Sequence, residues 1–175
     1  MLGSRRDFLR ATLALVSIGL AFVTPPPTAG QTLAQGGVLR VTGMVQRPLA
    51  LRDSDLQGLP RKHLAVTDEK GKPVTYDGVA VADILLRAGA PLGRRLRGQQ
   101  MRCYVVVDAE DGYRVVYALP EFDPDFTDKV VIVADRRDGH ALGPGEGPFR
   151  LVAPDDKRHA RWVREVTVLD VEQVR

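Results

Sequence analysis

Apolar and polar residues alternate along much of the chain after residue 37, a two-residue period that is typical of β-strands with one buried face. The first such segment alternates Leu39 and Val41 with Arg40 and Thr42. The predicted strands cover residues 38–45, 49–51, 63–67, 73–76, 101–107, 113–119, 129–134, 149–152 and 163–171.

A helical period of apolar residues predicts one clear helix, at about residues 79–88. Asp77 is its predicted N-cap, and Gly89 ends it. A shorter capped turn is predicted from Asp53. The residues that would form the buried face of the longer helix are Val81, Ile84, Leu85 and Ala88.

Two sharp turns connect predicted strands as hairpins. One occupies residues 68–71, and the other is formed by Asp111 and Gly112, a pair typical of tight hairpin turns. Strands do not alternate regularly with helices, which disfavours a doubly wound parallel sheet. The sequence therefore predicts an α+β fold with mixed, mostly antiparallel β-sheets.

The N-terminal segment has the features of a bacterial export signal. The paired Arg5 and Arg6 precede an apolar run at residues 11–23. That run has 13 residues, whereas a membrane-spanning helix needs about 20, so a transmembrane anchor is the weaker alternative. Residues 1–34 are predicted to be a twin-arginine signal peptide and tether, and residues 36–175 a single domain exported to the periplasm.

Charge gives little indication of a macromolecular partner. The formal net charge of +3 includes three arginines and one aspartate of the signal segment, so the remaining chain carries about +1. No segment resembles a nucleic-acid-binding arm. We therefore expect no nucleic-acid partner, and no membrane association after the signal is cleaved.

Cysteine and histidine residues are few and widely spaced. Cys103 is the single cysteine, so no internal disulfide can form. His63, His140 and His159 lack the spacing of metal ligands. Haem-attachment and iron–sulfur motifs are also absent from the sequence, so the chain carries no electron-transfer centre of those kinds.

Short motifs recur along the chain in a characteristic order. They are Gly43-x-Val45 with Pro48-Leu49, Leu59-Pro60, Tyr76-x-Gly78-Val79, Leu85-Leu86-x-x-Gly89, Asp111-Gly112-Tyr113, Gly147-Pro148-x-Arg150-Leu151-Val152-x-Pro154 and Arg161-Trp162-Val163. No single motif is specific. Their order from about Gly37 to Leu169 resembles the oxidoreductase molybdopterin-binding domain family, which has the sulfite-oxidase-like fold, in its small single-domain exported bacterial form.

The resemblance implies a domain that holds a molybdenum–molybdopterin cofactor. In catalytic members a cysteine thiolate binds the metal, and it precedes the Tyr-x-Gly-Val segment. The corresponding residues 64–75 contain no cysteine, and Thr67 or Asp68 would be a poor substitute for a soft sulfur donor. The resemblance also implies that basic residues just before Trp162 bind the pterin phosphate. The residues it nominates as cofactor-binding are Arg158, His159 and Arg161.

Other candidate residues have structural interpretations. Cys103 is interpreted as a core residue that shares a strand face with Met101, with a reactive thiol or a displaced metal ligand as the alternatives. The glycine-rich loop at 143–148 is interpreted as a plain connection, with an anion-binding backbone as the alternative. Arg94, Arg95 and Arg97 are interpreted as exposed loop charges.

Three functions are compatible with these patterns, and none has an assigned catalytic residue. The first is an exported molybdopterin-binding-domain protein without the metal-ligating cysteine, acting as a binding or interaction module. Its ligand would be a pterin or another anionic small molecule, and a periplasmic redox or protein partner is also compatible. The alternative is an active periplasmic molybdenum-dependent oxidoreductase with an external electron partner. The third is an unrelated exported structural domain with a jelly-roll or immunoglobulin-type sandwich.

Overall fold

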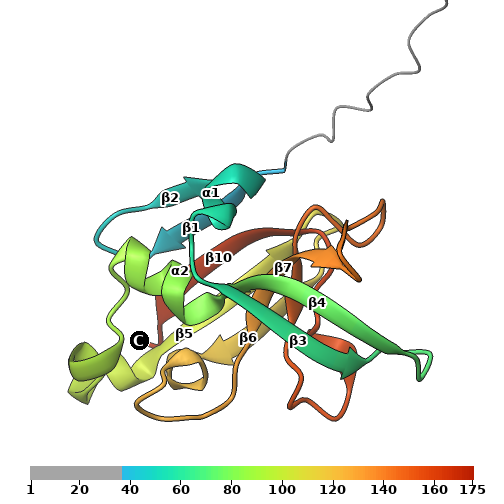
Figure 1. The fold of residues 1–175 in the computed structure, drawn as a ribbon. Helices are drawn as coiled ribbons and strands as arrows, with labels where there is room; N and C mark the ends of the chain where they lie inside the picture. The colour runs from blue at the N-terminus through green and yellow to red at the C-terminus, as the bar shows by residue number, and fades with distance from the viewer. Residues whose placement is uncertain (1–36) are drawn as a thin grey trace, which may run out of the picture. The chain divides into compact units, whose positions relative to one another are not determined.

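The computed structural model describes residues 37–175, and the predicted signal peptide and tether at 1–34 lie outside the described residues. The described part contains ten strands, two α-helices and four short 3-10 helices (Figure 1). The helices are α1 (Asp53–Gln57), α2 (Val81–Ala88), η1 (Gly93–Arg95), η2 (Gly98–Arg102), η3 (Leu119–Phe122) and η4 (His159–Arg161). The strands are β1 (Leu39–Gly43), β2 (Leu49–Leu51), β3 (Arg61–Thr67), β4 (Pro73–Ala80), β5 (Cys103–Ala109), β6 (Arg114–Ala118), β7 (Ile132–Arg137), β8 (His140–Ala141), β9 (Arg150–Val152) and β10 (Val166–Gln173).

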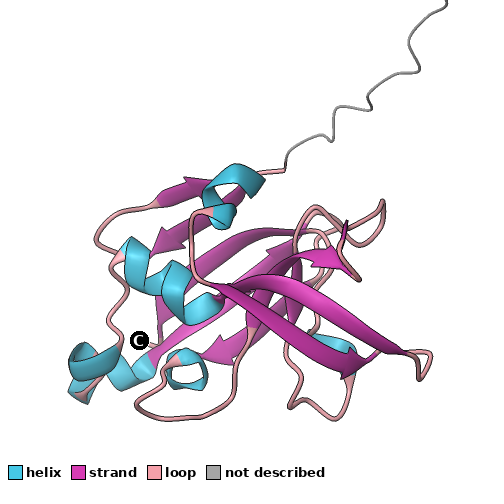
Figure 2. Ribbon diagram, viewed as in Figure 1, coloured by secondary structure: helices cyan, strands magenta, loops and turns pink. Residues whose placement is uncertain are grey.

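The strands form two sheets of five (Figure 2). The first has the order β2-β1-β10-β5-β6, and the second has the order β3-β4-β7-β8 with β9 also paired to β7. Among the described strand pairs, β1 with β10 is parallel and the others are antiparallel. The predicted α+β class with mixed, mostly antiparallel sheets is confirmed.

One hydrophobic core joins the two sheets and α2. Leu39 and Val41 of β1 are fully buried, as their alternation predicts. The buried face of α2 is the predicted one: Val81, Ile84, Leu85 and Ala88. Because residues three and four apart share one helix face, this stripe packs α2 against the sheets.

The start of α2 differs from the prediction. Asp77 is not an N-cap, because it lies inside β4, and the N-cap is Ala80. Strand β4 continues to Ala80 because it pairs with β7 as well as with β3. Gly78 permits this pairing, since a Cβ atom there would lie 2.2 Å from the carbonyl oxygen of Val133. A cross-strand neighbour therefore overrides a local helical pattern.

Both predicted hairpins are present. Residues 68–71 connect β3 and β4, and Asp111 with Gly112 connects β5 and β6. The predicted strand at 101–107 begins too early. Met101 is exposed on η2, and β5 begins at Cys103. Within residues 37–175, no helix has both the length and the apolar character that crossing a membrane requires.

Candidate anion-binding site

A broad hollow lies between the β3–β4 turn and the loop that leads into η4. Its volume is about 710 Å³. It brings together two segments that are some ninety residues apart in the sequence. The residues that line it are Thr67, Asp68, Glu69, Lys157, Arg158, His159 and Ala160. The segment where the family resemblance expects a metal ligand thus faces the segment where it expects phosphate contacts.

Two of the three nominated cofactor-binding residues, Arg158 and His159, line this hollow together with Lys157. Lys157 and Arg158 are exposed, and within residues 37–175 neither side chain forms an ion pair. His159 stacks on Trp162 with ring centroids 3.8 Å apart and an angle of 21° between the rings. Trp162 is buried and donates its indole N–H to the carbonyl of Ala153, which fixes the ring that supports His159.

The third nominated residue, Arg161, does not line the hollow. Its guanidinium pairs with Asp156 at 2.7 Å and with Glu121 at 3.0 Å, and lies 4.1 Å from the ring centroid of Tyr117. The hydrogen bond to Asp156 raises the pKa of Arg161, although burial acts in the opposite direction. These contacts hold the loop after β9 against η3 and β6, so the Arg161 side chain is committed to structure.

Neither Thr67 at the end of β3 nor Asp68 in the β3–β4 turn suits a metal that needs a soft sulfur donor. Asp68 accepts backbone N–H groups from Lys70 and Lys72, and its second oxygen pairs with Arg137 at 2.8 Å. The hydrogen bond from Lys72 is the first cause of its lowered pKa. Thr67 offers a hard, weakly basic hydroxyl. In the catalytic members of the family that the sequence resembles, the ligand to molybdenum is a soft thiolate. The donor set therefore does not fit a thiolate-bound metal.

Glu69 joins this hollow to a smaller adjacent one of about 260 Å³. Its carboxylate accepts a hydrogen bond from Arg164 at 2.8 Å and lies 3.3 Å from Arg150. The hydrogen bond from Arg164 lowers the pKa of Glu69, whereas burial raises it. The nearby Arg150 and His159 also lower it. Glu69 is thus a neutralised anion at the edge of the site.

Behind Glu69 lies a polar cluster that sequence reasoning missed. Arg150 is almost fully buried and binds Glu146 at 2.6 Å, while Tyr76 donates its hydroxyl to the same carboxylate oxygen at 2.7 Å. Burial and the hydrogen bond to Glu146 raise the pKa of Tyr76 to about 12. The Nε of Arg150 has no hydrogen-bond partner in the described part of the protein. Tyr76 and Arg150 occur in the motifs quoted above, but the sequence gives no signal that pairs them.

Cys103 lies away from this region. Its thiol is buried, contacts Gln100 and Gln173, and has a pKa raised mainly by burial. It is the first residue of β5, whereas Ala109 at the other end of β5 lines a small hollow that also contains Glu69. Six strand residues span about 20 Å. Cys103 is therefore too distant to serve as a ligand in the site.

Three of the four backbone N–H groups in the loop at 143–148 already have partners within the described residues. The N–H groups of Glu146 and Gly147 bond to the carbonyl of Gly143, and that of Gly145 bonds to Glu165. Asp111 accepts the backbone N–H of Tyr113, which is a turn contact. Across residues 37–175, no three histidine, cysteine, aspartate or glutamate side chains gather in a way that could hold a metal ion.

Comparison with known proteins supports the fold alone. No family model matches the chain, and no curated protein matches it. Among solved structures, the chain is similar to the sulfane dehydrogenase SoxCD from Paracoccus pantotrophus, with a TM-score of 0.60 and 20% sequence identity. The match covers 77% of this chain and 38% of that chain.

The fold is therefore distantly sulfite-oxidase-like. This agrees with the fold that the order of sequence motifs implies, and it differs from the jelly-roll or immunoglobulin-type sandwich that an unrelated structural domain would have.

Proposed function

We propose that this protein is an exported binding module of the sulfite-oxidase-like fold, which takes a pterin or a similar phosphate-bearing small molecule without a thiolate-bound metal. The observation that carries the proposal is the hollow in which Lys157 and Arg158 face the β3–β4 turn. Guanidinium and ammonium groups without an internal partner are well suited to phosphate, which they bind through charge-assisted hydrogen bonds.

The acidic residues of the hollow do not oppose this role. Asp68 is paired with Arg137, and Glu69 is paired with Arg164 and Arg150. The unpaired charges that a ligand meets within the described site are therefore those of Lys157 and Arg158. His159, supported by Trp162, adds a flat ring at the edge of the same hollow.

The residues present fit the phosphate-bearing part of molybdopterin better than its metal. A bound molybdopterin would supply redox chemistry at its metal, and no side chain of residues 64–75 provides the thiolate for that metal. A binding role is therefore favoured over an oxidoreductase role.

The test is purification of the full chain from a host that makes molybdopterin, followed by pterin fluorescence after oxidation and by metal analysis. We expect bound pterin with little molybdenum. Arg158→Gln should lower the pterin content at least about tenfold, since one charge-assisted contact contributes about 1.5–3 kcal/mol. Arg40→Gln, an exposed arginine on β1, is the matched control and should leave the content unchanged.

Two results would contradict the proposal. Stoichiometric molybdenum would favour the oxidoreductase with an external electron partner. Folded protein that neither retains pterin nor binds a pterin phosphate added in solution would rule out a pterin as the ligand.

The export part of the proposal has its own test. Replacing Arg5 and Arg6 with lysine should keep the full-length chain out of the periplasmic fraction, because the signal depends on paired arginines. Periplasmic delivery of this variant at the normal level would contradict export by the twin-arginine route.

A further inference from the structure

One flank of the described domain carries arginines that have no acidic partner. It comprises the β1–β2 loop, the C-terminal end of α2, η1 and η2, and we call it the arginine flank. Its six exposed arginines are Arg47, Arg87, Arg94, Arg95, Arg97 and Arg102. None of the six forms an ion pair with another described residue. The arginines that do form ion pairs are Arg61, Arg114, Arg137, Arg150, Arg161 and Arg164.

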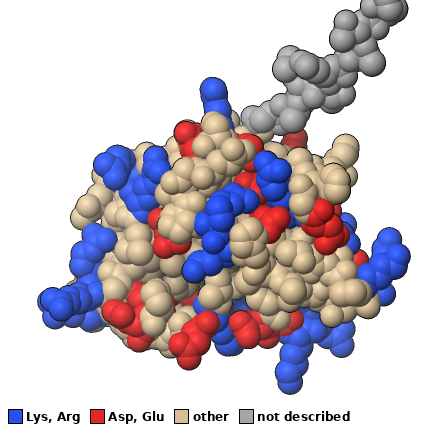
Figure 3. Space-filling model, in the orientation of Figure 1, with Lys and Arg blue, Asp and Glu red and all other residues tan. Residues whose placement is uncertain are grey.

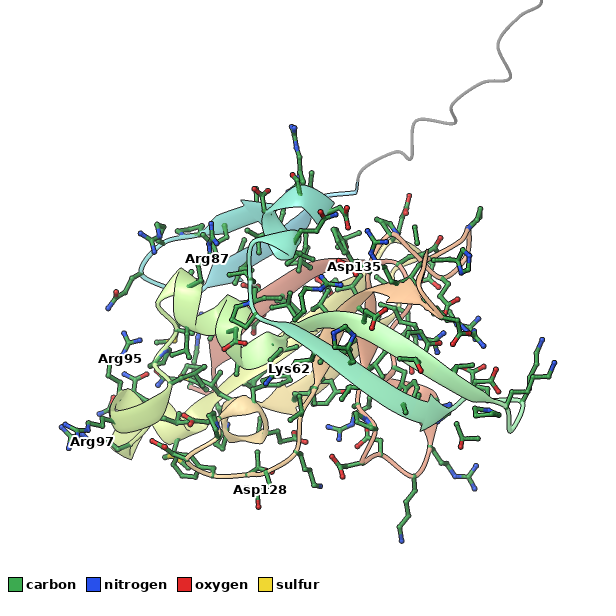
Figure 4. The ribbon with its side chains drawn as sticks, viewed as in Figure 1. Lys62, Arg87, Arg95, Arg97, Asp128 and Asp135 are labelled. Atoms are coloured by element: carbon green, nitrogen blue, oxygen red, sulfur yellow. The ribbon has the colours of Figure 1, made fainter. Side chains whose placement is uncertain are left out.

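Hydrogen bonds show that the elements of the flank lie side by side. Arg47 donates to the carbonyl of Arg87, and Arg95 donates to the carbonyls of Gly89 and Ala90. Figure 4 places the labelled Arg87, Arg95 and Arg97 along the same edge of the domain. The space-filling view in Figure 3 shows blue side chains along that edge.

A structural role accounts for only part of this charge. Arg47 and Arg95 bind carbonyl groups at the end of α2, where cations are favourable. The side chains of Arg87, Arg94 and Arg97 make no hydrogen bond with the described residues. Clustered like charges destabilise a compact domain through repulsion, so their grouping on one surface calls for a further explanation.

Apolar side chains are exposed on the same flank. It contains four of the seven large hydrophobic residues that are exposed in the described domain, namely Met44, Leu86, Met101 and Val174. Val174 belongs to the flank because its N–H bonds to the carbonyl of Arg102. Met44 also lines a hollow of about 590 Å³ together with Arg95 and Arg97. The flank thus combines a concave surface, exposed apolar groups and unpaired positive charge.

The type of cation distinguishes between classes of partner. Protein–protein interfaces are enriched in arginine, methionine and aromatic residues and depleted in lysine. All the cations of the flank are arginines, although the chain has five lysines, at positions 62, 70, 72, 129 and 157. Those lysines lie on β3, the β3–β4 turn, the loop before β7 and the loop before η4.

We propose that the arginine flank is a docking surface for an acidic protein, whose carboxylates pair with the arginines while its apolar side chains cover Leu86 and Met101. The flank lies at the Cys103 end of β5. The Ala109 end lines a small hollow that shares Glu69 and His159 with the candidate anion-binding hollow. A partner could therefore occupy the flank without covering Arg158. This inference does not depend on the identity of the small-molecule ligand.

The test measures binding of a synthetic helical peptide that carries glutamate on one face and leucine on the other. A peptide with glutamine in place of glutamate is the first control. The variant Arg87→Gln/Arg94→Gln/Arg97→Gln removes three charges from the flank. The matched variant Arg40→Gln/Arg52→Gln/Lys72→Gln removes three exposed charges elsewhere. Binding is measured by fluorescence anisotropy at low ionic strength and again at about 150 mM salt.

The expected result is binding of the glutamate peptide, at least about tenfold weaker for the flank variant and nearly unchanged for the matched variant. Leu86→Ser/Met101→Ser should also weaken binding, because apolar contact is part of the surface. Equal losses in both charge variants, or no binding of the glutamate peptide by the native protein, would overturn the proposal. Preferential binding to anionic phosphatidylglycerol vesicles would overturn it in favour of a membrane surface.

Discussion

Removal of the buried guanidinium of Arg150 should destabilise the whole domain. Its side chain is 5% exposed and that of Glu146 is 19% exposed, with 2.6 Å between Nη1 and Oε1. The guanidinium carbon also lies 5.4 Å from the ring centroid of Tyr76 and 5.9 Å from that of Trp162. The change Arg150→Met keeps an unbranched apolar stem and removes the guanidinium, with its charge, its hydrogen bonds and its contacts with the two rings.

The magnitude follows from the surroundings of Glu146. Breaking a buried ion pair by removing one partner costs about 3–5 kcal/mol. Glu146 is only partly buried, and it keeps the hydroxyl of Tyr76 and the guanidinium of Arg137 at 3.6 Å. The substitution also removes the buried Nε of Arg150 that lacks a partner among the described residues. Both effects place the cost at the low end, about 3 kcal/mol, or roughly 10 °C in Tm.

Urea unfolding of the native domain, Arg150→Met, Glu146→Gln and the double variant measures this interaction as a double-mutant cycle. We expect the double variant to be more stable than the sum of the single effects predicts, by about 1–3 kcal/mol, because the second change removes the stranded carboxylate. Strictly additive losses, or a loss below about 1 kcal/mol for Arg150→Met, would refute the buried-pair reasoning.

Three further outcomes are expected. Gly78→Ala should cost about 3 kcal/mol or more in urea unfolding, since its Cβ would lie 2.2 Å from the Val133 carbonyl oxygen, and unchanged stability would contradict the close strand packing. Cys103→Ser should cost about 1 kcal/mol and leave pterin content unchanged, because the thiol is a distant core group; loss of pterin would contradict this. The pKa values of Glu69 and Glu146 are lowered on folding, so their stabilisation is complete above the ordinary value of 4.5 and disappears as pH falls below it. Urea unfolding between pH 7 and pH 3 should show this loss, reduced in Glu146→Gln, and an equal loss in that variant would contradict the assignment.

The sequence predicted the parts of the fold that depend on neighbouring residues. The β3–β4 and β5–β6 hairpins follow from local turn chemistry, and the buried face of α2 follows from helical spacing. The extension of β4 through Gly78 to Ala80 was missed because it depends on β7, which lies more than fifty residues further along the chain. A local pattern of valine and alanine cannot reveal such a neighbour.

The candidate site was predictable only in part, for the same physical reason. The family resemblance nominates Arg158, His159 and Arg161, and the first two line the hollow. Arg161 instead turns toward Asp156 and Glu121. The carboxylate of Glu146, in the glycine-rich loop, is paired internally with Arg150 and Tyr76. Which charges remain available to a ligand depends on how distant loops meet, and that information arises only in the folded chain.

The parallel pairing of β1 with β10 has a consequence for biosynthesis. Thr42 on β1 bonds to Asp170 on β10, a separation of 128 residues. A chain emerging from the ribosome therefore holds β1 with an unsatisfied inner edge until β10 has been made. A chain that stops before β10 would expose that edge to aggregation.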